Sequence, residues 1–179
     1  MGAELLAACR GYSSSSAGLI VGAVTVFGGL GGTAVGGWIA QMWLKKNKRA
    51  LYLISAWSAL LTVPPAVACF FGPRWAMVPG LATALFFIFL GNGPLNAAIV
   101  NSVSGAIRAT AIAIELFMIH ALGDAPSPRL IGLVSDRSTL GTGLGVTLIT
   151  MVVAAALLFL GAKTVSTSED APPEPGLLT

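Results

Sequence analysis

The feature that most constrains the fold of this chain is the recurrence of apolar stretches long enough to cross a lipid bilayer. Crossing the hydrocarbon core takes about 20 helical residues. Such stretches follow one another along nearly all of the 179 residues, and only 9% of the residues are charged, against about 25% in soluble domains. The sequence therefore predicts an all-α, polytopic transmembrane helix bundle and excludes a soluble domain.

Hydropathy places about five spans, joined by short segments that are polar or rich in helix breakers, such as LKKNKR and FGPR. We interpret residues 1–16 as the remnant of a preceding helix with an outer loop. Residues 17–162 form the transmembrane bundle, and residues 163–179 are expected to be a disordered cytoplasmic tail. The expected spans are residues 17–43, 51–71, 75–103, 109–134 and 140–162.

Basic residues set the expected orientation, because lysine and arginine accumulate on the cytoplasmic side of membrane proteins. An odd number of spans places the two termini on opposite sides. We therefore expect a plasma (inner) membrane protein with its amino terminus outside and its carboxy terminus cytoplasmic, and an outside amino terminus suggests that a segment is missing upstream. The residues then inside are Lys45, Lys46, Lys48, Arg49, Arg108 and Lys163, against Arg10, Arg74 and Arg137 outside.

Small residues line one face of the first expected span. Gly28, Gly32 and Gly36 recur every four residues, which puts them on the same side of a helix. Such a face lets another helix backbone approach closely. Two interpretations stay open, a static packing surface and a gating surface against which another helix slides.

The third expected span ends in FLGNGPLNAAIVNS, which combines a proline with two amides. Pro94 lacks a backbone donor and has glycines nearby, so we expect a kink or local unwinding near Asn92. Asn92 and Asn96 share one face and should look toward other helices or a cavity. They are candidates either for interhelical hydrogen bonding or for a substrate path.

The fourth expected span carries ionisable residues, each of which costs about 2.5–3.5 kcal/mol at the centre of a membrane helix on insertion scales. His120 and Asp124 are four residues apart and therefore neighbours on one face. Glu115 lies about 140° around the helix from His120, so it addresses a different neighbour. The pair is either a structural ion pair or part of a hydrated path for substrate or protons, and the same alternatives hold for Glu115.

Two prolines follow this pair. Pro126 and Pro128 are expected to break the helix just beyond Asp124, and the carbonyl groups freed there need protein or water around them. Arg129 is expected near the outer membrane surface, where its long side chain reaches the headgroups.

Enzymatic and nucleic-acid-binding functions find little support in the sequence. The net charge of +3 is explained by basic loops between apolar spans. The chain has a single histidine, and Cys9 and Cys69 match no metal-ligand or redox spacing. We therefore expect no enzyme, no metal, no cofactor and no nucleic-acid partner.

The segment RATAIAIELFMIHALGDAPSPRLIGLVSDR resembles the eleventh helix of Spinster-type transporters of the major facilitator superfamily. The family pattern is R-x-T-A…H-x-x-G-D-x-x-S-P-x-L-I-G-x-x-S-D-R. The segment GYSSSSAGLIVGAVTVFGGLGGTAVGGWIAQMWLKKNKRA is similar to the eighth helix and the cytoplasmic loop that follows it. The resemblance maps the five spans to helices eight to twelve. The residues that match the eleventh-helix pattern include His120, Gly123, Asp124, Ser127, Pro128, Gly132, Asp136 and Arg137.

The resemblance implies the carboxy-terminal portion of a secondary, proton-coupled transporter that works by alternating access. Its implied solute is a small organic or amphiphilic, lipid-like molecule. The implied partners are membrane lipids, this solute and the missing amino-terminal half. Two alternatives remain, a truncated remnant that does not transport and a half that works only with a separate partner half.

Overall fold

The computed structural model describes residues 14–137 and 140–165 as a bundle of helices, with no strand in those ranges. Five helical segments are long and apolar enough to cross a membrane, which confirms the predicted all-α transmembrane bundle. Our expectations for the first 13 residues and for the tail from residue 166 lie outside the described residues. The helices are α2 (Ser14–Leu44), α3 (Ala50–Phe71), α4 (Arg74–Asn101) and α7 (Leu140–Thr164), and the fourth segment combines η1 (Gly105–Ile107), α5 (Arg108–Met118), η2 (Ile119–Asp124) and α6 (Ser127–Ser135).

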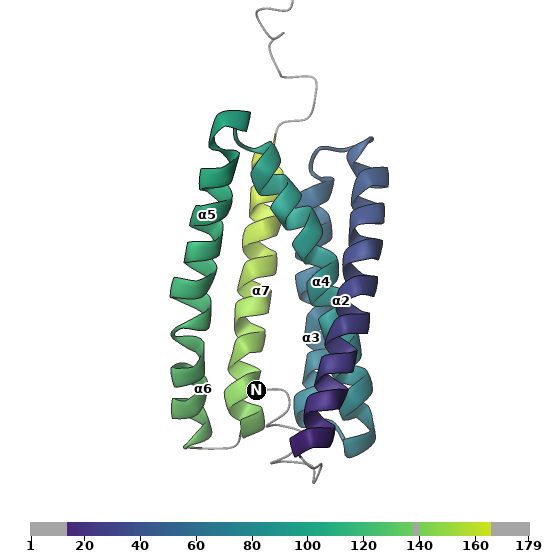
Figure 1. Ribbon diagram of the computed structural model, residues 1–179, viewed down its shortest axis with the longest axis vertical. Helices are drawn as coiled ribbons and strands as arrows, with labels where there is room; N and C mark the ends of the chain where they lie inside the picture. Colours follow the sequence, from purple (N-terminus) through teal and green to yellow (C-terminus); the bar gives the residue numbers. More distant parts are fainter. Residues whose placement is uncertain (1–13, 138–139, 166–179) are drawn as a thin grey trace, which may run out of the picture.

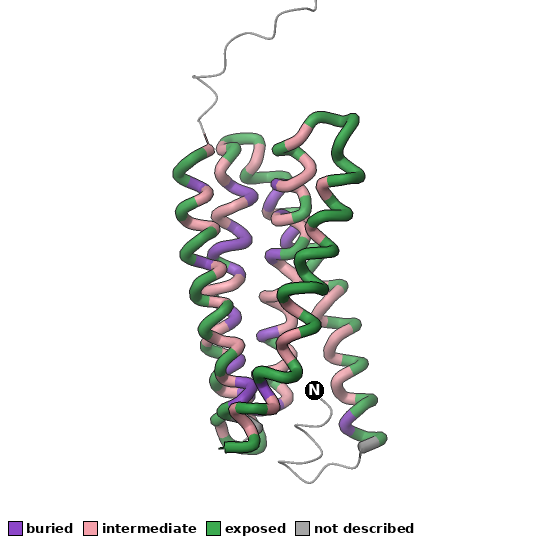
Figure 2. The backbone as a smooth tube through the Cα atoms, turned by 90° about the vertical axis from the view of Figure 1, so that its left-hand side faces the viewer, coloured by how far each residue is buried: buried purple, intermediate pink, exposed green. Residues whose placement is uncertain are grey.

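The helices run side by side and alternate in direction (Figure 1). Helix α4 packs against both α2 and α3, α7 packs against α3, and α6 packs against α7. Two clusters of buried residues occupy opposite ends of this assembly, one with Met77 and Leu144 and the other with Leu51 and Ala98. The segment from η1 to α6 lies at the edge and is exposed along most of its length (Figure 2).

The glycine face of α2 lies directly against α4. A Cβ atom added to Gly32 would clash with the carbonyl oxygen of Phe86, and one added to Gly36 would clash with that of Leu90. At Gly28 the nearest atom to an added Cβ is the backbone nitrogen of Phe86, 3.4 Å away. The two backbones approach closely because these positions carry no side chain.

Buried hydroxyl groups join α3 to α4 at another close contact. Ser55 Oγ lies 3.0 Å from the Leu51 carbonyl and 2.9 Å from the Gly91 carbonyl of α4. Ser58 Oγ donates to the Phe87 carbonyl of α4. Gly91 has no room for a side chain because Ser58 Oγ would lie 2.5 Å from an added Cβ. Small polar residues therefore fix the register of these two helices.

Helix α4 continues through Pro94 without interruption. The local unwinding expected near Asn92 is therefore not observed. The Asn96 side chain donates to the Asn92 carbonyl at 3.1 Å, so an amide of this helix supplies a hydrogen bond in the turn around the proline. Pro94 itself is buried in the bundle, where neighbouring helices hold the turn in place.

Candidate functional site

The edge helix changes its hydrogen-bond pattern near the middle of the expected membrane span. It is α-helical in α5, π-helical in η2 and α-helical again in α6. At the end of η2 the N–H of Ala125 donates to the carbonyl of His120, five residues earlier, at 3.0 Å. Short π-helical turns are rare in proteins, and those that do occur are frequently found at functional sites.

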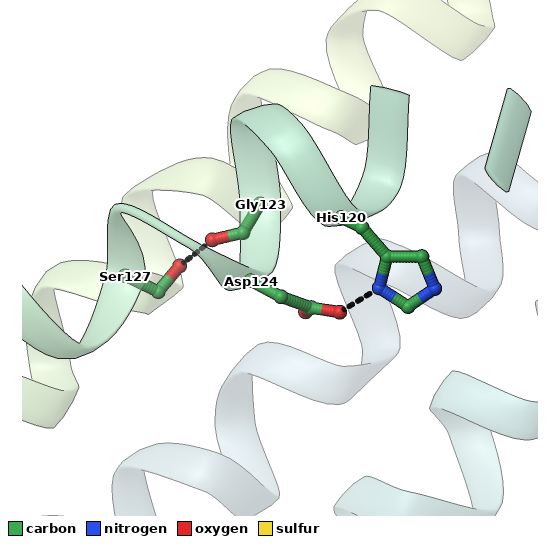
Figure 3. A network of polar contacts seen from close by, with 4 residues as sticks. All are labelled: His120, Gly123, Asp124 and Ser127. Carbon is green, nitrogen blue, oxygen red and sulfur yellow. Dashed lines mark hydrogen bonds and ion pairs between the residues drawn. The ribbon is translucent and has the colours of Figure 1, made fainter. Parts of the chain in front are cut away.

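The missing N–H of Pro126 explains why the pattern changes in this part of the helix. Pro126 has no backbone N–H, so the carbonyl of Leu122 loses the donor it would have in an α-helix. Ser127 Oγ donates to the carbonyl of Gly123, so a side chain also bonds the backbone where the pattern changes (Figure 3). The expected break beyond Asp124 appears as two turn residues, but the irregular pattern begins earlier, at Ile119.

His120 and Asp124 form an ion pair across η2 (Figure 3). The distance from His120 Nδ1 to Asp124 Oδ2 is 2.6 Å, and the two side chains are 70% and 67% exposed. The pair is therefore satisfied internally yet faces away from the rest of the described chain.

Glu115 lies in α5, the helix directly before η2, and does not contact this pair. Its Oε2 atom is buried and has no hydrogen-bond partner among the described residues. A buried carboxylate oxygen without a partner is costly. Glu115 is thus the residue of this helix whose hydrogen bonding is left incomplete by the described chain.

The remaining predicted residues lie apart from the ion pair. Asn92 and Asn96 are exposed on α4, and the glycines at positions 28, 32 and 36 lie at the contact of α2 with α4. Pro126 is half-buried at the start of α6, whereas Pro128 and Arg129 are exposed in its first turn. The structure therefore brings together His120 and Asp124, and it does not bring Glu115 or the two asparagines to them.

An apolar cavity that the sequence did not indicate lies between α3, α4 and α7. It has a volume of about 220 Å³. Its two threonine hydroxyl groups are used within their own helices: Thr62 donates to the Ser58 carbonyl at 2.9 Å and Thr147 to the Leu144 carbonyl at 2.6 Å. The lining is otherwise apolar or sulfur-containing, so the cavity suits hydrocarbon and not a polar headgroup. Periodicity alone marks such residues as buried and cannot reveal a gap between three helices.

Five membrane-length helices and an exposed ion pair within one of them define a multi-pass membrane protein. No protein-family model matches the chain. Several curated relatives are similar to it in sequence. The chain is 31% identical over 152 residues to the probable sphingolipid transporter spinster homolog 3 of Arabidopsis thaliana, an alignment that covers 84% of this chain and 30% of the relative.

Animal relatives give a similar result. Protein spinster homolog 1 of Mus musculus is 37% identical over 134 residues, which cover 69% of this chain and 24% of the relative. The sphingosine-1-phosphate transporter SPNS2 of Danio rerio is 36% identical over 130 residues, covering 69% of this chain and 25% of the relative. The chain therefore belongs to the spinster family, and its alignments span from 24% to 30% of the length of these relatives.

Proposed function

We propose that this chain is the carboxy-terminal portion of a secondary transporter that moves a lipid-like solute across the membrane by alternating access. Two of the relatives named above are described as a probable sphingolipid transporter and as a sphingosine-1-phosphate transporter. In this proposal the helices α2 to α7 correspond to helices eight to twelve of the family. The amino terminus lies outside and the carboxy terminus in the cytoplasm, in the plasma membrane.

The observation that carries the proposal is the exposed His120–Asp124 pair in η2. Each ionised group facing lipid at this depth costs about 2.5–3.5 kcal/mol, so the face with 70% and 67% exposed side chains needs protein or water against it. A second helical half that encloses a hydrated path would supply both. We assign the pair to proton coupling, with His120 accepting and releasing the proton.

Glu115 supports the same arrangement. Its buried Oε2 has no partner among the described residues, and in this proposal the rocking of the halves uncovers this oxygen to a donor. Asn92 and Asn96 line the path in this proposal as exposed amides on α4. Gly28, Gly32 and Gly36 hold α2 against α4, so α2 and α4 move as one body when the halves rock.

The test is uptake into vesicles by this chain fused behind the amino-terminal half of the Arabidopsis thaliana relative. We expect uptake of a sphingoid phosphate or a lysophospholipid that increases with an imposed pH gradient. His120→Gln and Asp124→Asn should each reduce the gradient-dependent rate at least tenfold without reducing the amount of protein in the membrane. Lys163→Gln, which also removes one charge, is the matched control and should transport normally.

Two results would contradict the proposal. Normal gradient-dependent transport in both His120→Gln and Asp124→Asn would exclude the pair from proton coupling and leave it a structural contact. No transport of any tested solute by the fused protein, although it is correctly inserted, would favour a remnant that does not transport.

A further inference from the structure

A second hollow lies at the end of the bundle where α2 and α4 end and α3 begins. We call this end of the bundle, at the top of Figure 1, the basic end. It has a volume of about 530 Å³. Two of its lining residues, Leu51 and Ala98, are buried and form an aliphatic floor. Lys48, Asn101 and Ser102 are exposed and form a polar rim. The hollow is therefore amphiphilic, unlike the apolar cavity described above.

Hydrogen bonds from three helices hold the walls of this hollow in place. Arg49 Nε donates to the carbonyl of Val165 at 2.9 Å and so ties the loop between α2 and α3 to the end of α7. Ser102 Oγ donates to the Ala98 carbonyl at 2.7 Å, which leaves Tyr52 as the donor in its 3.3 Å contact with Ser102 Oγ. This contact joins α3 to the end of α4.

Charge at the basic end is uncompensated among the described residues. Lys48 forms no ion pair with a described residue. Lys45, Lys46 and Arg49 of the same loop add further positive charge. None of the described acidic residues, Glu115, Asp124 and Asp136, belongs to the loop or to the helix ends that surround the hollow. An anion that also carries hydrocarbon fits both the rim and the floor.

We propose that this hollow binds the phosphate headgroup of an anionic membrane phospholipid. Lys48 contacts the phosphate, the Asn101 amide donates to the headgroup, and the floor of Leu51 and Ala98 receives the first carbons of an acyl chain. Basic pockets between membrane helices are suited to anionic headgroups. The proposed lipid site is formed by residues of the basic end alone, so its test does not depend on whether the chain takes part in transport.

The acidic residues that follow Val165 in the sequence are a competing occupant. Glu169, Asp170 and Glu174 would satisfy the charge of Lys48. A carboxylate gains nothing from an aliphatic floor, however, whereas a phospholipid buries hydrocarbon there. We therefore propose the phospholipid as the occupant of the hollow.

Native mass spectrometry of the whole chain in detergent, titrated with phosphatidylglycerol or with phosphatidylcholine, tests the site. We expect one phosphatidylglycerol molecule to bind at least tenfold more tightly than phosphatidylcholine. Lys48→Gln should remove this preference while it still binds phosphatidylcholine as the parent chain does, which shows that this variant folds. Lys48→Arg keeps the positive charge and should keep the preference. Lys45→Gln is the matched control from the same loop and should weaken binding by no more than about fivefold, the effect of one basic residue near an anionic lipid.

Each remaining outcome overturns the proposal in a different way. Equal losses in Lys48→Gln and Lys45→Gln would mean a diffuse attraction without a site. Displacement of the lipid by millimolar inorganic phosphate would mean that the hollow binds an anion and does not recognise the acyl chain. A tenfold gain in lipid affinity when Glu169, Asp170 and Glu174 are together replaced by their amides would mean that the acidic segment is the resident occupant.

Discussion

At the scale of single residues, Gly32 shows how exacting the contact between α2 and α4 is. An added Cβ would meet the Phe86 carbonyl oxygen, which is backbone and cannot move aside. We expect Gly32→Ala to destabilise the bundle by about 1–3 kcal/mol, as other overpacked positions do. Gly37 lies on the same helix with nothing within 4 Å of an added Cβ. Gly37→Ala should therefore be neutral or slightly stabilising, because alanine is the better helix former.

Reversible unfolding in mixed detergent measures both glycine variants against the parent chain. Equal stability of the Gly32→Ala and Gly37→Ala variants would show that α2 and α4 do not approach as closely as described. The spacing of the glycines predicted a close approach, but not its partner, because a face of small residues accepts any helix backbone. Ser55 and Ser58 of α3 were not predicted for a related reason, since their hydrogen bonds depend on which carbonyl groups lie opposite them on α4.

At the scale of one element, the π-helical turn depends on Pro126 more than on Pro128. Pro126 leaves the Leu122 carbonyl without its α-helical donor. Pro128 lies in the first turn of α6, where a missing N–H costs little. We expect Pro126→Ala to restore α-helical hydrogen bonding and to slow amide hydrogen exchange over residues 119–125 by at least tenfold. Pro128→Ala, the matched control, should leave exchange in that segment unchanged.

A slowing of exchange by both variants, or by neither, would contradict a specific role of Pro126 in forming η2. The sequence indicated that the fourth span is interrupted, and it placed the interruption at the prolines. It did not show that the change begins at Ile119. A π-turn results from a shift of hydrogen-bond partners before the proline, and the spacing of apolar residues does not reveal such a shift. Pro94 gave the opposite result, since α4 continues through it.

At the scale of the whole molecule, the number of spans and the helical class were predictable because length and apolarity decide them. The faces that the bundle leaves open were not predictable, since they depend on which helices pack together. Helix α7 packs against α3, whereas the segment from α5 to η2 has no buried residue. This open face carries the ion pair, and a partner half in the proposed transporter would cover it.

Cysteine labelling tests that cover directly. Leu116 in α5 is 51% exposed and lies four residues before His120, on the same face of the helix. Leu160 in α7 is 56% exposed, so both positions start from similar accessibility. In a chain whose two native cysteines are replaced by alanine, we expect fusion to the amino-terminal half to slow maleimide labelling of Leu116→Cys at least fivefold. Labelling of Leu160→Cys should stay the same, because the proposed half approaches from the side of His120. Unchanged labelling at Leu116→Cys would show that this face stays open to lipid, and the exposed charges of His120 and Asp124 would then need water alone to stabilise them.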